Sequence, residues 1–240
     1  MKRRDVIKRL TMLPVAGRVF STSVPAAPAA GSNPPSTLLQ DRPMPALHRQ
    51  AFVMDGHTHV MTRELLMKTD IGQRYSDGTV DLPRAKEGGV DAMFFSVYTP
   101  ENYYPGRFET KNTFRVVELA LDQIGKNSSE IELALNGSDI ERINESGKIA
   151  AFLDLEGGYD LDGDLHLLRA LYRLGLRSMQ LTAHNTTNAF IDACNDVYTW
   201  GGINDHGRAV IKEMNDLGMV INVAHASNDA ILQSVAASRH

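Results

Sequence analysis

The chain has almost no cysteine and no long apolar run, and both absences narrow what it can be. Cys194 is the single cysteine in 240 residues, so an internal disulfide is excluded and the redox compartment stays open. No apolar stretch approaches the roughly 20 residues of a membrane-spanning helix. Basic residues are not in excess, since the formal net charge is -4. This balance argues against nucleic acid or an anionic membrane surface as a partner.

The first 30 residues differ from the rest and predict export. Arg3 and Arg4 precede two apolar residues and a lysine, as in a twin-arginine signal, and an apolar stretch runs from Leu10 to Phe20. The small residues at 25–30 suit a signal peptidase. The alternative is a disordered basic leader, because Arg18 interrupts the apolar stretch. We expect a periplasmic protein.

The predicted organisation has three parts. Residues 1–30 form the signal peptide, and residues 31–50 form a linker rich in proline, serine and asparagine. Residues 51–240 form one folded domain, whose length is ordinary for an α/β barrel.

Within the domain, short apolar segments rich in branched residues alternate with segments of helical period. The predicted strands are 51–57, 90–97, 131–135, 149–156, 176–182 and 219–225, and the predicted helices are 81–88, 110–126, 138–146, 165–174, 205–217 and 229–237. Ser138 and Ser227 are the expected caps of the helices that follow them. Most strands are apolar along their whole length, which indicates a parallel sheet covered on both faces.

Two architectures fit this alternation, a doubly wound sheet and a (β/α)8 TIM barrel. The doubly wound nucleotide fold usually has a glycine-rich turn after its first strand, whereas this first strand ends in the segment 55–59, Asp-Gly-His-Thr-His. We therefore predict a TIM-barrel type. It is an incomplete barrel, because we count about five to six βα units where closure needs eight. An open barrel exposes sheet edges and one flank of its core, so we expect the chain to be part of a longer barrel.

Three of the predicted strands end in residues that bind metals. His57 and His59 are two positions apart on a strand, so both side chains point to one side. Imidazole nitrogen suits zinc and related ions. Glu156 and His225 also end apolar strands, and a buried, unpaired carboxylate would be costly without a cation. Asp154 shares the side of Glu156 and competes for its role.

Each of these residues has a simpler interpretation when it is considered alone. The histidines could be surface or hydrogen-bonded core residues, and Glu156 could be a strand-end acid beside a turn. Gly157 and Gly158 would let the backbone turn sharply and approach a ligand closely. In a barrel, however, the three strand ends converge on one mouth. A carboxylate between two nitrogen-rich positions can bridge two metals, which makes hydroxide available near neutral pH for hydrolysis of a carbonyl or phosphoryl group.

An ordered set of motifs is similar to the membrane (renal) dipeptidase family, peptidase family M19. The segments that carry the resemblance are 55–59, 88–97, 154–158, 167–177, 181–182, 207–208 and 217–227. They follow the family's order and spacing from about Phe52 to the last residue. The resemblance implies a (β/α)8 barrel with two zinc ions that hydrolyses dipeptides, often with a D-residue at the C-terminal position.

The resemblance also implies roles for individual residues. His57 and His59 match the pair that binds the more buried zinc, Glu156 matches the carboxylate that bridges both zincs, and His225 matches a ligand of the second zinc. The family usually has aspartate where this chain has His59, so the site carries one negative charge less. A substrate-contacting histidine is matched by His184 only with a one-residue slip. The candidate catalytic residues are therefore Glu156 and His184.

The family's second histidine for the second zinc, its substrate-binding arginine and its late aspartate would lie beyond His240. We therefore expect the chain 1–240 to hydrolyse dipeptides poorly or not at all. Robust turnover by a protein of residues 31–240, abolished by Glu156→Ala, would contradict this. The expected partner is a small dipeptide, and a homodimer is left open.

Two other interpretations remain at this point. One is another amidohydrolase-type barrel acting on a cyclic amide, lactone or phosphotriester, which His59 fits well. Many such enzymes have a metal-bridging lysine, whereas the corresponding strand here offers Glu156. The other is a catalytically dead barrel fragment that binds metal or a partner.

Overall fold

The computed structural model describes residues 45–59, 70–76, 78–100, 109–183 and 185–239. The chain divides into two compact units, residues 1–52 and residues 53–240. In the first unit the described part is the short helix α2 (Ala46–Gln50), which falls within the predicted linker and was not predicted. Among the described residues, no helix combines the length and apolar character that crossing a membrane requires.

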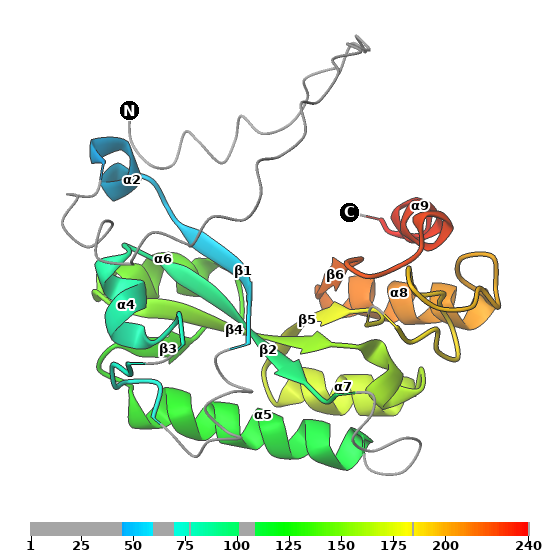
Figure 1. Cartoon of the computed structure of the whole chain (residues 1–240), viewed down its shortest axis with the longest axis horizontal. Helices are drawn as coiled ribbons and strands as arrows, with labels where there is room; N and C mark the ends of the chain where they lie inside the picture. Colours follow the sequence, from blue (N-terminus) through cyan, green and yellow to red (C-terminus); the bar gives the residue numbers. More distant parts are fainter. Residues whose placement is uncertain (1–44, 60–69, 77, 101–108, 184, 240) are drawn as a thin grey trace, which may run out of the picture. The chain divides into compact units, whose positions relative to one another are not determined.

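The second unit contains a parallel sheet curled into half of a barrel (Figure 1). Its strands are β1 (Met54–Thr58), β2 (Ala92–Tyr98), β3 (Ile131–Leu133), β4 (Ile149–Glu156), β5 (Leu176–Gln180) and β6 (Val220–Asn222). The order is β1-β2-β4-β5-β6, and β3 pairs with the first half of β4. This confirms the predicted α/β fold of an incomplete TIM barrel. The last strand is four residues shorter than predicted and ends three residues before His225.

Helices connect successive strands, as a parallel sheet requires. They are α4 (Leu82–Glu87), α5 (Glu109–Lys126), α6 (Gly137–Glu145), α7 (Leu165–Arg173), α8 (Asp205–Leu217) and α9 (Asn228–Ala237), with the short 3₁₀ helix η2 (Gly158–Leu161) after β4. Figure 1 shows α5 and α7 along the same side of the sheet.

The caps of these helices follow from local sequence, with one correction. Ser227 caps α9 as predicted, by accepting from the backbone N–H of Ala230. The prediction that Ser138 caps α6 is wrong, because the side chain of Asn136 accepts the N–H of Asp139 instead. Asparagine is as good a cap as serine, and the Ser138 hydroxyl bonds to the Asn136 side chain.

The two faces of the sheet bury different side chains. On the helix-covered face, Phe95 of β2 and Leu153 of β4 belong to the main core and are fully buried. On the other face, the rings of Phe94 and Phe152 stack with centroids 4.9 Å apart, next to Ile143 of α6. Farther along β2 and β4 this second face becomes polar. The polar side chains therefore gather at the carboxyl ends of the strands, where barrels carry their active sites.

An irregularity in β1 directs the histidine pair to that polar face. Met54 pairs with Ala92, but Thr58 pairs with Phe95. Between these two pairs β1 advances by four positions while β2 advances by three. One extra residue reverses the alternation of side chains after the irregularity. Thr58 thus shares the core side with Phe95, and the neighbouring residues His57 and His59 face the polar side.

The turn after β4 depends on close backbone packing. Gly157 has φ +95°, which confirms the predicted sharp turn. The backbone at Gly158 also packs closely against the chain, since a Cβ there would lie 2.7 Å from the carbonyl oxygen of Leu181 and 3.1 Å from Cζ of Phe190. The close approach to a ligand stays a prediction.

We expect Gly158→Ala to destabilise the fold by about 1–3 kcal/mol, as overpacked sites do. Gly125 in α5 is the matched control, because a Cβ there meets nothing within 4 Å. Gly125→Ala should stabilise by about 0.5–1 kcal/mol through its higher helix propensity. Urea unfolding of both variants measures these differences. Equal stability of Gly158→Ala and the unsubstituted chain would show that the turn has room for a side chain.

Candidate metal centre

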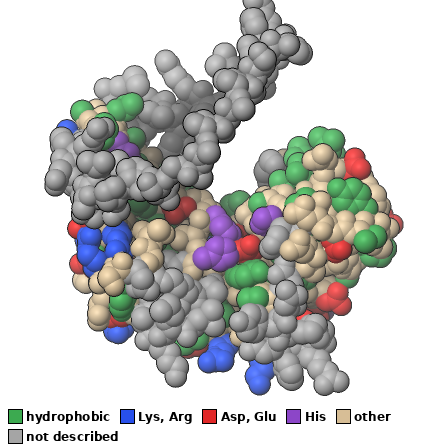
Figure 2. Space-filling model, in the orientation of Figure 1, with side chains coloured by type: hydrophobic (Ala, Val, Ile, Leu, Met, Phe, Trp, Pro, Cys, Tyr) green, Lys and Arg blue, Asp and Glu red, His purple; other side chains and the backbone are tan. Residues whose placement is uncertain are grey.

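Three predicted ligands from two strands meet at the polar end of the sheet. One ligand atom from each of His57, His59 and Glu156 lies within 4.8 Å of the other two. The Nε2 atoms of His57 and His59 are 3.2 Å and 2.9 Å from Oε2 of Glu156, and 3.2 Å from each other. Figure 2 shows histidine side chains gathered near the middle of the visible face, beside acidic ones.

Glu156 is the buried member of this group, with its residue only 5% exposed. Its Oε2 also accepts a hydrogen bond of 2.9 Å from the Ser96 hydroxyl on β2. Burial alone would raise the pKa of the Glu156 carboxyl, but hydrogen bonds from His57 and His59 outweigh burial and hold the pKa well below its usual range. The carboxylate is therefore ionised.

Asp154 lies on the same face of β4 but contacts the opposite edge of the His57 ring. Its Oδ2 is 3.3 Å from Nδ1 of His57, while Nε2 of that ring faces Glu156. The hydrogen bond to Asp154, and then the one to Glu156, raises the pKa of the His57 imidazole to about 10. A carboxylate that binds one ring nitrogen and leaves the other for a metal is a common outer partner in zinc sites. Asp154 therefore does not compete with Glu156.

His225 lies near the same carboxylate from the other side of the half-barrel. It follows β6 in a turn, with φ +64°, and not at the end of a strand as predicted. Its Nε2 is 3.8 Å from Oε1 of Glu156. The two oxygens of Glu156 thus face different groups, Oε2 the pair His57 and His59 at the end of β1 and Oε1 the ring of His225.

The structure brings together four of the five candidate residues. His184 lies outside the described residues, so its role remains a prediction. Sequence reasoning assigned no role to Ser96, which bonds to Glu156. The pairing of β2 with β4 would have indicated this contact. Ser96 pairs with Asp154, and Tyr98, two residues farther along β2, pairs with Glu156. The side chain of Ser96 therefore points to the same face of the sheet as that of Glu156.

The donor atoms and the charge of the group fit a divalent cation. Oδ1 of Asp154 is buried without a hydrogen-bond partner among the described residues, which is costly unless positive charge lies nearby. Imidazole nitrogens and carboxylate oxygens form the usual donor set of zinc sites. A curled parallel sheet with these donors at the carboxyl ends of its strands is typical of barrel-type metal-dependent hydrolases.

The family model of the membrane dipeptidases, peptidase family M19, matches residues 42–240, and the chain belongs to this family. Rat Dipeptidase 3 is 32% identical over 206 residues, which cover 81% of this chain and 41% of that protein. Dipeptidase tcpJ of Claviceps purpurea is 31% identical over 166 residues, covering 66% of this chain and 39% of that protein. The chain thus spans about two fifths of the length of these relatives.

Solved structures share the fold. The probable dipeptidase PvdM of Pseudomonas aeruginosa has a TM-score of 0.72 at 20% identity, covering 80% of this chain and 51% of that chain. A metallopeptidase of Rhodobacter sphaeroides, liganded with a phosphinate mimic of the dipeptide L-Ala-D-Ala, has a TM-score of 0.67 at 20% identity. The match covers 78% of this chain and 62% of that chain. At these identities the likeness extends to the fold alone.

Proposed function

We propose that this chain is the metal-binding part of a zinc-dependent dipeptidase. The observation that carries the proposal is the division of the Glu156 carboxylate between His57 and His59 on one oxygen and His225 on the other. A carboxylate in this arrangement can hold two cations at once. The membership in a family of metallopeptidases supports the same assignment.

In the proposed centre, His57, His59 and Glu156 would hold one zinc ion, and Glu156 and His225 would supply some of the ligands of a second. When bound, a pair of zinc ions polarises a carbonyl group and makes hydroxide available near neutral pH. The chain's own residues supply the geometry. Asp154 orients the ring of His57, and Ser96 fixes the rotamer of Glu156 through its hydroxyl.

We propose a dipeptide as the substrate, with a D-residue accepted at the C-terminal position. The relatives are named dipeptidases, and one solved relative was liganded with a mimic of L-Ala-D-Ala. His184 is proposed to contact the substrate. Periplasmic export through a signal at residues 1–30 stays a prediction from the sequence, since that segment lies outside the described residues, and a homodimer stays open.

The test compares the chain 1–240 with the product of the complete reading frame in its source. Both are stripped by a chelator, reloaded with zinc, and assayed for metal content and for hydrolysis of L-Ala-D-Ala. We expect both to bind zinc, and the complete product to hydrolyse the dipeptide in a zinc-dependent way. Little turnover is expected from 1–240.

Three results would contradict the proposal. Hydrolysis of a cyclic amide, lactone or phosphotriester without hydrolysis of dipeptides would favour another barrel hydrolase. Stoichiometric zinc without turnover in the complete product would favour a metal-binding protein without catalysis. Failure of both proteins to bind zinc would exclude the metal centre.

A further inference from the structure

We propose that Asp192, in the segment between β5 and α8, is a positioning residue that holds His225 next to Glu156. The inference rests on the proposed metal centre, of which His225 is one ligand. It is carried by three features of the described structure: the backbone of His225, the segment that binds this backbone, and the buried carboxylate that organises the segment.

The backbone of His225 adopts a conformation that it would not keep unaided. Its φ of +64° lies in the left-handed region. Among the described residues, Asp162 is the only other non-glycine residue with a positive φ. A side chain with a Cβ is strained in this region. Such a conformation persists only when neighbouring structure holds it, and no helix or strand includes His225.

Residues 192–194 hold the turn on both sides of His225. The backbone N–H of Cys194 donates to the carbonyl of His225 at 2.8 Å, and the N–H of Ser227 donates to the carbonyl of Asp192 at 2.9 Å. Between these bonds, Ala193 and Ala226 form an antiparallel bridge. The position of His225 is therefore set by a short pairing with residues 192–194.

The carboxylate of Asp192 fixes that short segment. Asp192 is 0% exposed, and three backbone N–H groups donate to it. They belong to Thr199 at 2.8 Å, Trp200 at 3.0 Å and Gly202 at 2.8 Å. A carboxylate that accepts several backbone bonds closes the loop from 192 to 202 and gives it one conformation.

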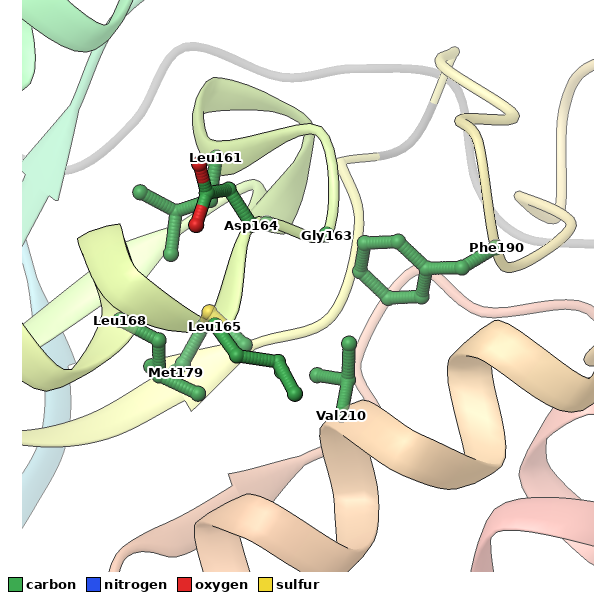
Figure 3. Close-up of a pocket in the computed structure, with 9 residues that line it drawn as sticks. Leu161, Gly163, Asp164, Leu165, Leu168, Met179, Phe190 and Val210 are labelled. Carbon is green, nitrogen blue, oxygen red and sulfur yellow. The ribbon is translucent and has the colours of Figure 1, made fainter.

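The start of the segment is anchored by packing. Phe190 is 1% exposed, and Figure 3 shows its ring pointing toward Val210 of α8 and Gly163. The loop is thus held at one end by an aromatic ring and in its middle by Asp192. A loss of the Asp192 carboxylate should free the pairing with His225 while the helices around Phe190 remain packed.

The test replaces Asp192 with asparagine, which directs an amide N–H toward backbone donors. The matched control is Asp196→Asn on the same loop, because Asp196 also accepts backbone bonds, from Thr187 and Val197 at 2.7 Å each, but is exposed. In the metal-free protein, NMR hydrogen exchange at the amides of Cys194 and Ser227 should rise about 10-fold or more in Asp192→Asn. Exchange in β4 should not change in either variant.

The second readout separates positioning of His225 from a merely structural role. Cobalt(II) affinity and visible absorption are measured for Asp192→Asn, His225→Ala and the double variant. Asp192→Asn should weaken cobalt binding about 10-fold or more, as loss of an outer partner of a metal site does, and should change the spectrum as His225→Ala does. In the His225→Ala background it should have no further effect, because both changes remove the same interaction.

Each remaining outcome decides between the two proposals. Unchanged exchange, or faster exchange with unchanged cobalt binding, would overturn the role of Asp192. Absence of cobalt binding in the unsubstituted chain would contradict the proposed metal centre instead, and the exchange data would still decide whether Asp192 holds the turn. If Asp192→Asn does not fold, Cys194→Pro, which removes the N–H that reaches His225, should give the same loss, and normal cobalt binding in that variant would overturn the inference.

Discussion

Replacing Glu156 with glutamine should weaken metal binding by on the order of 100-fold or more, since even residues that only support a ligand cost 10–100-fold. The substitution preserves the size of the side chain but removes its negative charge, which lies between the pair His57 and His59 on one side and His225 on the other. It also places a nitrogen where one carboxylate oxygen faces His57, His59 or His225. In the complete protein, zinc-dependent dipeptide hydrolysis should fall with the metal content.

Glu132→Gln is the control for this variant. Glu132 lies on β3, which pairs with β4, and its carboxylate bonds to Arg142 and Lys148, away from the histidines. We expect its zinc affinity, measured by competition with a chromophoric chelator, to equal that of the unsubstituted chain. Normal zinc binding by Glu156→Gln would contradict the assignment of Glu156 as a ligand.

Strands and helices could be predicted where the local sequence marks both of their ends. The strand 149–156 and the helix 205–217 were predicted to the residue. The first is apolar until its last residues, and the second ends at Gly218, which adopts φ +71°. The cap of α6 was misplaced because Asn136 and Ser138 are both good caps, and the choice between them depends on backbone geometry.

The candidate site could be predicted in part for a similar reason. Strand ends converge in a barrel, so His57, His59 and Glu156 could be grouped without knowing any distance. The irregularity of β1 was not visible in the sequence, because a single inserted residue leaves the composition of the strand unchanged. The roles of Asp154 and Asp192 were missed because they depend on hydrogen bonds to segments distant in the chain.

Asp154→Asn should weaken metal binding and also lower the stability of the metal-free protein. Zinc affinity should fall about 10–100-fold, because the charge that orients His57 and strengthens it as a ligand is lost. The free energy of unfolding of the metal-free protein should also fall near neutral pH, since Asp154 is fully buried and its hydrogen bond to His57 is the largest cause of the raised pKa of that imidazole. Removing one partner of such a pair destabilises a fold.

Asp160→Asn is the control for Asp154→Asn. It shows whether the loss of zinc affinity is specific to Asp154 or follows from removing any buried carboxylate nearby in the sequence. Asp160 is 2% exposed, and its carboxylate accepts a hydrogen bond from the hydroxyl of Thr113 on α5. Its substitution should change urea unfolding and leave zinc affinity unchanged. If Asp154→Asn lost stability but kept its zinc affinity, Asp154 would be a structural residue of β4, and the orientation of His57 would have to come from Glu156 and His59 alone.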